Sequence, residues 1–355
     1  MSAPDLRRMC SVIEHRGPDG GGYALLDHGT LGFAHVRLSV IDLVTGTQPL
    51  SSTDGQVTIV FNGELYDYQQ HREALVRSGH QFRTMSDTEV LLNLYLEHGT
   101  ESFSKLNGEF AFVIWDGRFQ RLIAVKDRFG VKPLFFHRTQ DELFFVSEIK
   151  SLFTLSRVSR AFNPDFFMSA FFGTFTPDTH LFQNIHPLPP GHFLRIERGV
   201  WNEPEPYWKP KFATQVSMTM DEATEGVRDR FTRAVSRRMI ADVPVGSYLS
   251  GGIDSTLVCG VMSQQSNKVR SFNIGFENTS YNESALARRI AGHYGAEFET
   301  VDCTSEKLAD HFEKTVLHVE QPLMNPIHVS ELASPLYYAV GPQTISGSSE
   351  CRHRA

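Results

Sequence analysis

The sequence predicts two domains: an α+β domain in the first half of the chain, and in the second half an α/β domain with a doubly wound parallel sheet. The 355 residues exceed what a single hydrophobic core usually organises. Short apolar strands dominate the first half, whereas helices and strands alternate in the second. Between them, residues 186–210 concentrate Pro and Gly around one short strand, which predicts a domain exit and linker. We therefore expect domains at 1–205 and 206–355.

The first half is expected to contain short strands and two helices. The strands are continuous apolar runs, typical of strands covered on both faces, at 57–61, 110–115, 122–125 and 143–146. The first helix is expected over 69–78, with Gly79 at its end. The second is expected to begin at Ser86, which forms a capping box with Glu89, and to end at Gly99.

The second half is expected to begin with an amphipathic helix, because apolar residues recur there at helical spacing. These residues are Val227, Phe231, Ala234, Val235 and Met239. Strands are then expected at 245–249, 271–276, 297–301 and 344–346, and helices at 255–262, along Leu286, Ile290 and Tyr294 up to Gly295, and after 301. This alternating order is typical of a parallel, doubly wound sheet.

The composition excludes several classes of protein. A formal net charge of −7 argues against broad binding of nucleic acid, which requires clustered Lys and Arg. The four cysteines, Cys10, Cys259, Cys303 and Cys351, are scattered and show no metal-binding spacing. No apolar run reaches the roughly 18 residues of a membrane helix, and the N-terminus lacks the apolar core of a secretory signal. We expect a cytoplasmic protein with no nucleic-acid and no membrane partner.

The strongest chemical signal is the string SGGIDST at 250–256, which follows an apolar strand and opens a helix. Gly251 and Gly252 let the backbone approach an anion, and the amides at the helix start point toward it. Ser255 adds a hydroxyl donor, and Asp254 is a candidate ligand for Mg²⁺. The string lacks the lysine of a Walker loop, so transfer of a γ-phosphoryl group is not favoured. The alternative is a Gly-rich turn at the start of any α/β helix.

Longer motifs accompany this loop. In the first half they are HRGPDG at 15–20, RLSVIDL at 37–43, FNGELYDY at 61–68, SDTEV at 86–90, LNGEFAFVIWD at 106–116 and DRFGVKPLFF at 127–136. In this order they resemble the glutaminase domain of the asparagine synthase (glutamine-hydrolysing) family, and SGGIDS resembles the pyrophosphate loop of the N-type ATP pyrophosphatases. The resemblance covers nearly the whole chain. It implies a class II glutamine amidotransferase domain, an N-terminal-nucleophile αββα sandwich, followed by an adenine nucleotide α-hydrolase-like synthetase domain.

The resemblance assigns a glutamine site to the first domain. Arg37 matches the arginine that holds the glutamine α-carboxylate, a bidentate task for a planar guanidinium. Asp87 matches the carboxylate that faces the α-ammonium group, and Glu64 stands where a second carboxylate can bind that group. Asn62 and Gly63 match the oxyanion hole. The alternatives are an N-G turn after a strand for Asn62 and Gly63, and a helix-start residue favoured by the dipole for Asp87.

The expected nucleophile is missing from its usual place. Members of the family begin, after Met removal, with a cysteine that attacks glutamine. This chain begins with Met1 and Ser2. Cys10 lies just before the HRGPDG motif, whereas a strand and a loop separate the nucleophile from that motif in the family. We therefore interpret Cys10 as a buried helix residue, regard Ser2 as poorly placed, and expect glutaminase activity to be absent or strongly reduced.

The resemblance also assigns a nucleotide site to the second domain. The residues expected to bind pyrophosphate and Mg²⁺ are Ser250, Gly251, Gly252, Asp254 and Ser255, with Asp254 as the Mg²⁺ ligand. Ile274 is expected near the adenine, with a plain core residue as the alternative, and Ser346 and Gly347 near the nucleotide. Beyond Gly347 the sequence departs from the acidic motif of the family, and Asn325 stands where many members have Asp. We expect the chain to be short for the family at both ends.

The implied reaction joins ATP, aspartate and a nitrogen donor. The aspartate side-chain carboxylate attacks the α-phosphorus of ATP, which gives β-aspartyl-AMP and pyrophosphate. Ammonia, from glutamine or from solution, then displaces AMP to give asparagine, and Mg²⁺ neutralises the departing pyrophosphate. A homodimer is compatible with the resemblance. Two alternatives stay open: a β-lactam synthetase-like or other amide-forming enzyme, and a truncated, non-catalytic nucleotide-binding remnant.

Overall fold

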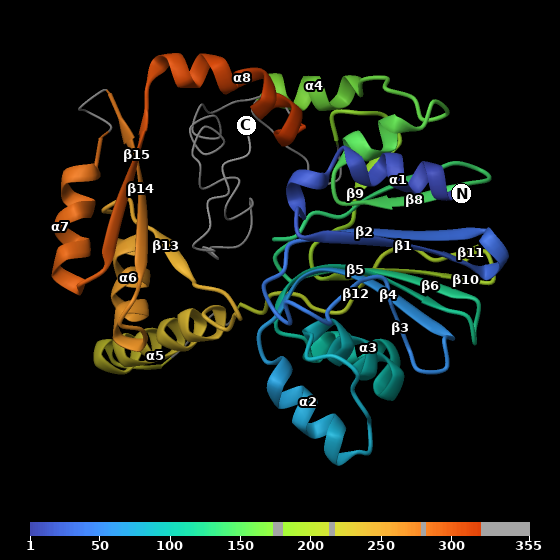
Figure 1. The fold of residues 1–355 in the computed structure, drawn as a ribbon, viewed down its shortest axis with the longest axis horizontal. Coiled ribbons are helices and arrows are strands. Elements are labelled where there is room, and N and C mark those ends of the chain that lie inside the picture. The colour runs from blue at the N-terminus through green and yellow to red at the C-terminus, as the bar shows by residue number, and fades with distance from the viewer. Residues whose placement is uncertain (173–179, 213–216, 278–281, 321–355) are drawn as a thin grey trace. The chain divides into compact units, whose positions relative to one another are not determined.

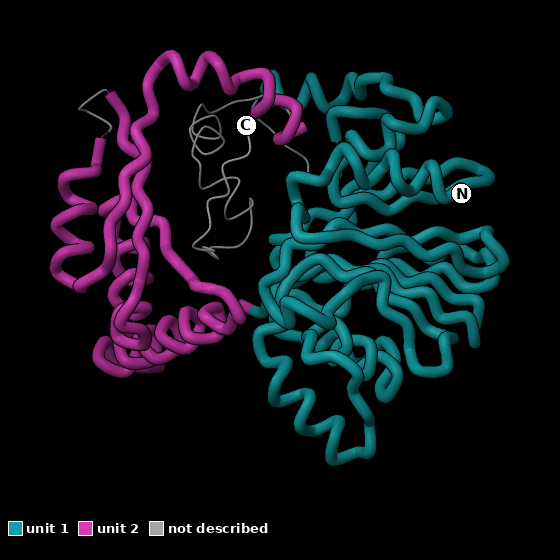
Figure 2. Tube along the Cα trace, viewed as in Figure 1, with its two compact units in different colours: residues 1–211 teal, residues 212–355 magenta. Residues whose placement is uncertain are grey.

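The computed structural model describes residues 1–172, 180–212, 217–277 and 282–320. The chain divides into two compact units, unit 1 (1–211) and unit 2 (212–355), which Figure 2 colours separately. The stretch 186–210 contains the short strand expected there, β10 (His192–Glu197), which pairs with β6 (Arg121–Lys126), so it is part of unit 1 and leads to the division between the units at 211/212. Its Pro and Gly residues therefore flank a strand of the main sheet.

Unit 1 consists largely of antiparallel strands (Figure 1). Besides β6 and β10, its strands are β1 (Gly20–Leu26), β2 (Leu31–Arg37), β3 (Leu50–Ser51), β4 (Val57–Leu65), β5 (Gly108–Asp116), β7 (Phe135–Arg138), β8 (Leu143–Val146), β9 (Ile185–Pro187), β11 (Val200–Trp201) and β12 (Glu205–Pro206). Its α-helices are α1 (Ala3–Ser11), α2 (Tyr68–Arg77), α3 (Asp87–His98) and α4 (Pro164–Phe171). The strands and both helices predicted for this half are confirmed, with ends within a few residues of the expected ones.

Two layers of sheet and two layers of helix make up the body of unit 1. The larger sheet has the strand order β11-β10-β6-β5-β4-β3, with β12 paired to β10. On one face α3 packs against β4, and on the other an apolar cluster joins this sheet to β2. The cluster includes Phe33 of β2, Val113 of β5 and Ala124 of β6. Helix α1 contacts β2 and forms the outer helical layer (Figure 1). The predicted αββα order is therefore confirmed.

The start of α3 differs in one detail from the prediction. Ser86 caps the helix, since its Oγ accepts the Glu89 amide at 3.2 Å. The Glu89 carboxylate, however, accepts the backbone amides of Arg83 at 3.0 Å and Thr84 at 2.7 Å instead of completing a capping box. Glu89 therefore holds the segment that leads into the helix, of which Asp87 is the first residue.

Unit 2 contains a parallel three-stranded sheet in its described residues. Its elements are α5 (Met220–Arg238), β13 (Gly246–Tyr248), α6 (Ile253–Gln265), β14 (Arg270–Phe276), α7 (Ser284–Tyr294), β15 (Glu297–Cys303) and α8 (Ser305–Val319). Parallel pairing is confirmed, in the order β13-β14-β15. A doubly wound sheet requires a reversal of strand order, and the described strands of this unit follow their chain order. The strand predicted at 344–346 lies outside the described residues.

The buried faces of α5 and α7 agree with the predicted ones in most positions, since Phe231, Val235 and Met239 of α5 and Ile290 and Tyr294 of α7 pack in apolar clusters. In α5, Val235 is buried, whereas Val227 is 66% exposed. Helix α7 packs through the buried Ala287, and Leu286 is 46% exposed. A small residue at the contact lets α7 lie close to its neighbours. Leu286 instead covers Gly251, where a Cβ would lie 3.2 Å from Leu286 Cγ.

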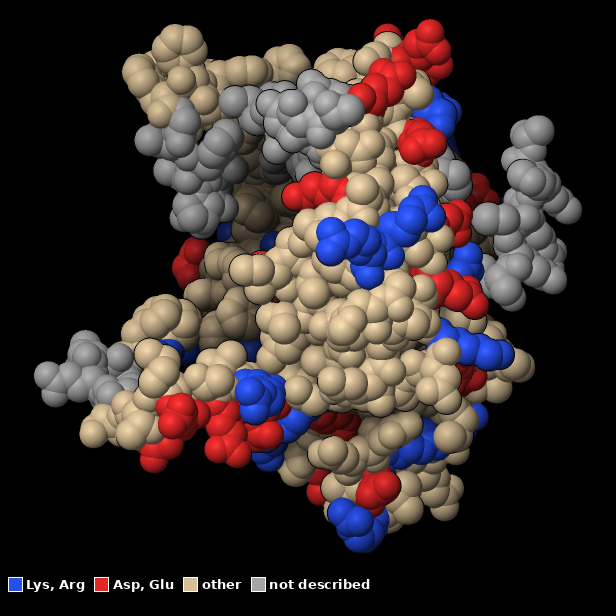
Figure 3. Space-filling view, turned by 90° about the vertical axis from the view of Figure 1, so that its left-hand side faces the viewer, with Lys and Arg blue, Asp and Glu red and all other residues tan. Residues whose placement is uncertain are grey.

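No helix among the described residues is long and apolar enough to cross a bilayer. On the face drawn in Figure 3, Lys and Arg side chains lie interspersed with Asp and Glu. The net charge of −7 is therefore not gathered into one patch on this face.

Candidate active site

The carboxyl end of β4 carries three of the predicted site residues, Asn62, Gly63 and Glu64. Gly63 pairs with Phe110 of β5 and has a φ of +149°, which L side chains rarely adopt. A Cβ at this position would lie 2.1 Å from the Glu109 carbonyl oxygen. Gly63 therefore allows the two strands to approach closely. Because Asn62 and Gly63 lie within a strand, the alternative of an N-G turn is wrong.

We expect Gly63→Ala to lower the free energy of unfolding by about 3 kcal/mol, because the added methyl group meets backbone atoms. Gly79→Ala is the matched control, since Gly79 also has a positive φ, +96°, but nothing lies within 4 Å of its Cβ position. This control should lose about 1 kcal/mol. Urea unfolding followed by tryptophan fluorescence reports on unit 1, which holds Trp115, Trp201 and Trp208. Equal losses in the free energy of unfolding of the two variants would contradict a close approach of β4 and β5 at Gly63.

Arg37, the last residue of β2, is held by backbone carbonyls. Its Nη2 donates to the carbonyl oxygens of Ile41, at 3.2 Å, and Asp42. The loop closes tightly over the guanidinium, since a Cβ on Gly46 would lie 2.5 Å from Nη2. Carbonyl acceptors carry no net charge, so they orient the guanidinium and leave its positive charge available. Arg37 can therefore bind a carboxylate in a fixed orientation.

The positive charge of Arg37 acts on two nearby carboxyl groups, those of Asp87 and Glu64. Asp87 is buried, and its Oδ2 accepts the Leu65 amide at 2.9 Å. Burial raises the pKa of Asp87 to about 6, although backbone hydrogen bonds and the charge of Arg37 act in the opposite direction. Burial and the charge of Asp87 raise the pKa of Glu64 well above its usual value, while Lys132 and Arg37 lower it. Both carboxyl groups therefore bind protons more strongly than usual, and a cationic group beside them would favour their ionised forms.

A buried lysine neutralises part of this acidic cluster. Lys132 is 3% exposed, and its Nζ lies 3.1 Å from Oε1 of Glu109, on the strand paired with β4. The positive charges of Arg37 and Lys132 thus act on three neighbouring carboxyl groups, those of Glu64, Asp87 and Glu109. Arg16 also acts on Lys132. When all three carboxyl groups are ionised, a positively charged group such as an α-ammonium is favoured beside them.

Asn62 lines a cavity of about 220 Å³ in unit 1, which residues of α1, β2, β4, β5 and β8 also line. Its Nδ2 is buried and has no hydrogen-bond partner among the described residues. A fixed donor without a partner suits an oxygen that gains negative charge during a reaction. No cysteine is among the described residues that line this cavity. Cys10 lies in α1, as predicted, where it is half-buried and burial raises the pKa of its thiol, so it is poorly activated as a nucleophile.

In unit 2, the predicted phosphate loop joins β13 to α6. Gly251 has a φ of +92°, and Gly252 is the N-cap residue of the helix. The hydroxyls of Ser250 and Ser255 lie 3.0 Å apart, and Gly252 donates its amide to Ser250 Oγ at 3.3 Å. Asp254 is exposed in the first turn of α6. The strand–loop–helix context is confirmed. The backbone amides at the N-terminus of α6 can bind phosphate groups.

Two family descriptions match the chain. The glutamine amidotransferase domain matches residues 1–208, and asparagine synthase matches residues 226–338. The chain belongs to the asparagine synthase family. Arg37 and Asp87 accordingly lie in the amidotransferase part of the family's architecture, and the phosphate loop lies in the asparagine synthase part.

Named relatives of this asparagine synthase-family chain match most of its length. The glutamine-hydrolyzing asparagine synthetase 1 of Bacillus subtilis is 35% identical over 334 residues, which cover 94% of this chain and 51% of the relative. Amidase chyE of Penicillium rubens is 37% identical and amidase chry2 of Gibberella zeae 36% identical, each over 340 residues and 90% of this chain. Those matches cover 49% and 50% of the two amidases. The chain thus spans about half the length of the curated relatives it matches.

Some residues that position the two sites carry little sequence signal. Asn273 of β14 donates from Nδ2 to the carbonyl oxygen of Leu249 at 2.8 Å and accepts the Ser284 hydroxyl at 2.6 Å. Asn273 thereby connects the start of the phosphate loop to α7. Its signal in the sequence is that a polar residue stands within an apolar strand. Lys132 stands in the DRFGVKPLFF motif, but its partner Glu109 becomes apparent only from the paired strands.

The remaining predicted nucleotide-binding residues are placed in part. Ile274 lies near the carboxyl end of β14, is half-buried, and pairs with Val301 of β15. Ser346 and Gly347 lie outside the described residues, as does Asn325. The described part of the predicted nucleotide site therefore consists of the loop at 250–255 and the adjoining end of β14.

Proposed function

We propose that the chain is the glutamine- and ATP-binding part of an enzyme that amidates aspartate to asparagine. The observation that carries the proposal is the set of charges around β4. Arg37 offers an oriented cation, Asp87 offers a buried carboxylate, and Asn62 offers an unpartnered amide donor. These are the three groups that the head group and side-chain carbonyl of glutamine need. The match of residues 226–338 to asparagine synthase supports the use of ATP.

In the glutamine site, each end of the head group meets a group of opposite charge. The α-carboxylate binds to Arg37 and the α-ammonium group to Asp87. Since a neighbouring cation favours the ionised form of a carboxyl group, ammonium binding lowers the pKa of Asp87 and releases its proton. Asn62 Nδ2, together with the Gly63 amide as second expected donor, stabilises negative charge on the side-chain carbonyl oxygen.

The ATP-dependent part of the reaction activates a carboxylate, which by itself is a poor electrophile. An oxygen of the aspartate side chain forms a bond to the α-phosphorus of ATP, and the bond from that phosphorus to the β-phosphate oxygen breaks, which releases pyrophosphate. The nitrogen of ammonia then bonds to the acyl carbon of β-aspartyl-AMP. AMP leaves with the electron pair of the broken acyl–oxygen bond, and the nitrogen loses a proton.

The residues of the phosphate loop fit phosphate groups and Mg²⁺. The hydroxyls of Ser250 and Ser255 converge to 3.0 Å, and the φ of +92° at Gly251 exposes backbone amides. Asp254 presents an exposed carboxylate beside them, and oxygen ligands are those that Mg²⁺ prefers. Asp254 would hold the ion, which would neutralise charge on the leaving pyrophosphate.

We expect the chain to release pyrophosphate from ATP and aspartate with ammonium as nitrogen donor but not with glutamine, because no cysteine lines the cavity at Asn62 among the described residues. A coupled pyrophosphate assay with ammonium, with glutamine and with neither measures this difference. Gly251→Ala should lower the ammonium-dependent rate at least tenfold, since a methyl group there is strained and meets Leu286. Gly292→Ala, where nothing lies within 4 Å of the Cβ position, is the matched control.

The outcomes of this assay separate the alternatives. Asparagine formation with glutamine, at a rate close to that with ammonium, would contradict the prediction that this chain lacks a nucleophile for glutamine hydrolysis. Binding of ATP without release of pyrophosphate under any condition would favour the non-catalytic nucleotide-binding remnant.

A second candidate function is amide formation on an acceptor other than aspartate, as in a β-lactam synthetase-like enzyme. The identity of 37% and 36% to two fungal proteins named amidases favours it. The same assay, with a panel of carboxylic acids in place of aspartate and mass spectrometry of the products, tests this candidate. Faster pyrophosphate release with another acid than with aspartate would favour it over asparagine synthesis.

A further inference from the structure

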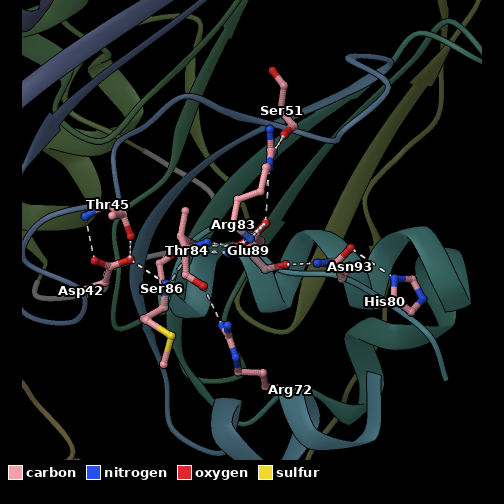
Figure 4. Close-up of polar contacts among 11 residues, drawn as sticks. Asp42, Thr45, Ser51, Arg72, His80, Arg83, Thr84, Ser86, Glu89 and Asn93 are labelled. Carbon is pink, nitrogen blue, oxygen red and sulfur yellow. Dashed lines mark hydrogen bonds and ion pairs between the residues drawn. The ribbon is translucent and has the colours of Figure 1, made fainter. Parts of the chain in front are cut away.

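The loop that holds Arg37 also contacts the segment before α3, and one residue, Asp42, makes both contacts. Asp42 has a φ of +55°, in the left-handed region that Asp tolerates better than most residues. Its carbonyl oxygen accepts a hydrogen bond from Arg37 Nη2. Its carboxylate lies beside Thr45 and points toward the segment that contains Thr84 (Figure 4). The two polar ends of this residue therefore serve two different parts of the glutamine site.

The carboxylate of Asp42 is a strong acceptor. It is 7% exposed, and it accepts the Thr45 amide on Oδ1 and the Met85 amide on Oδ2, both at 2.8 Å. Burial raises the pKa of Asp42, but hydrogen bonds from Thr45 and Met85 outweigh it and hold the pKa below its usual value. Asp42 is therefore ionised at neutral pH, and its bond to Met85 is charge-assisted.

The connection from Met85 to Asp87 is two residues of backbone. On its other side, this segment is anchored by Glu89, which accepts the Thr84 amide at 2.7 Å (Figure 4). Glu89 belongs to α3 itself, so it cannot set the position of the helix start relative to another element. Asp42 belongs to the loop that follows β2, so its bond to Met85 links the Arg37 loop to the start of α3.

We propose that Asp42 is a positioning residue that sets the spacing between Arg37 and Asp87, and thereby selects ligands that carry a carboxylate and an ammonium group on one carbon. This inference rests on the proposed glutamine site. A ligand with both groups has a fixed separation between its charges, and it binds well only when Arg37 and Asp87 match that separation. A ligand with the carboxylate alone uses Arg37 and is insensitive to the position of Asp87.

Isothermal titration of the full chain with L-glutamine and with glutaramate, which is glutamine without its α-amino group, tests the proposal. Asp42→Asn keeps the size and the tolerance for positive φ but exchanges one acceptor oxygen for a donor. We expect it to raise the Kd of L-glutamine about tenfold and that of glutaramate less than twofold. Asp54→Asn is the matched control, because the Asp54 carboxylate accepts hydrogen bonds only within an exposed turn, from Ser52 and Gln56. It should change neither Kd.

A second measurement requires no ligand. Hydrogen–deuterium exchange of residues 83–90 should become faster in Asp42→Asn and remain unchanged in Asp54→Asn, because only Asp42 holds the Met85 amide. If Asp42→Asn leaves the Kd of L-glutamine unchanged, or raises the Kd of L-glutamine and of glutaramate equally, the positioning role is overturned while the proposed function stands. If the wild-type chain does not bind glutamine, the proposed function and the ligand selection both fail. Unchanged exchange at 83–90 overturns the link between Asp42 and α3 in either case.

Discussion

Lys132→Met is expected to lower the free energy of unfolding of unit 1 by about 4 kcal/mol at pH 8. Lys132 is 3% exposed, and its Nζ lies 3.1 Å from Glu109 Oε1. Its charge also lowers the pKa of Glu64, which burial and Asp87 raise. Removal of this cation leaves Glu64, Asp87 and Glu109 with Arg37 as the remaining positive charge acting on the cluster. Methionine fills a similar volume, so the loss reflects charge rather than a cavity.

The pH dependence of this variant follows from the carboxyl groups. Without Lys132 the pKa of Glu64 in the folded state lies further above that in the unfolded chain. The folded state then gains stability from bound protons at low pH and loses it as the pH rises. The deficit of Lys132→Met should therefore grow between pH 5 and pH 8 in urea unfolding followed by tryptophan fluorescence.

Two further variants separate the charge from the side chain. Lys105→Met removes a lysine from an exposed position of unit 1 and should change the free energy of unfolding by less than about 0.5 kcal/mol. Glu109→Gln, added to Lys132→Met, should recover about half of the loss, because it removes the carboxylate that was paired at 3.1 Å. If Lys132→Met and Lys105→Met were equally stable, the buried cation would have no role in the cluster.

The residues that touch the proposed substrates could be predicted because they stand in contiguous motifs. Asn62, Gly63 and Asp87 lie at the end of a predicted strand or the start of a predicted helix, whereas Arg37 ends β2, a strand that was not predicted. Their supporting partners could not be predicted in this way. The contact of Asp42 with Met85 joins positions 43 residues apart, and no periodicity or local motif encodes such a pairing. Long-range hydrogen bonds of this kind follow from the packing of the sheet and α3.

The errors at the level of the fold have a common physical origin. Helical periodicity identified α5 and α7 and most of their packed residues, but it wrongly placed Val227 and Leu286 on the buried faces. Val227 is 66% exposed and Leu286 46% exposed, whereas the small Ala287 is buried. The composition of 186–210 predicted a domain exit around one strand, but it could not show that this strand, β10, pairs with β6 in the main sheet. In each case a tertiary contact overrides a local signal.

Asp87→Asn is expected to stabilise the empty fold and to abolish glutamine binding. The pKa of Asp87 is about 6 in the folded protein and near 3.8 in a model carboxyl group. Its contribution to stability is therefore fully present below about pH 3.8 and is lost as the pH rises through 6, so that ionised Asp87 destabilises the fold at pH 8 by about 3 kcal/mol. Asparagine has no charge to bury and can still accept the Leu65 amide. We expect a gain of about 2 kcal/mol at pH 8 that vanishes toward pH 4 in urea unfolding.

The same substitution should raise the Kd of L-glutamine at least 100-fold at pH 8 in isothermal titration, because the α-ammonium group loses its buried counter-charge. Asp165→Asn is the matched control, since Asp165 is an exposed acidic residue in the first turn of α4. It should lose about 0.5 kcal/mol through the helix dipole and leave glutamine binding unchanged. If Asp87 only began a helix, Asp87→Asn would behave like this control, with a small loss of stability and no change in affinity. A gain of stability together with a loss of affinity would instead identify Asp87 as a carboxylate kept buried for a cationic ligand.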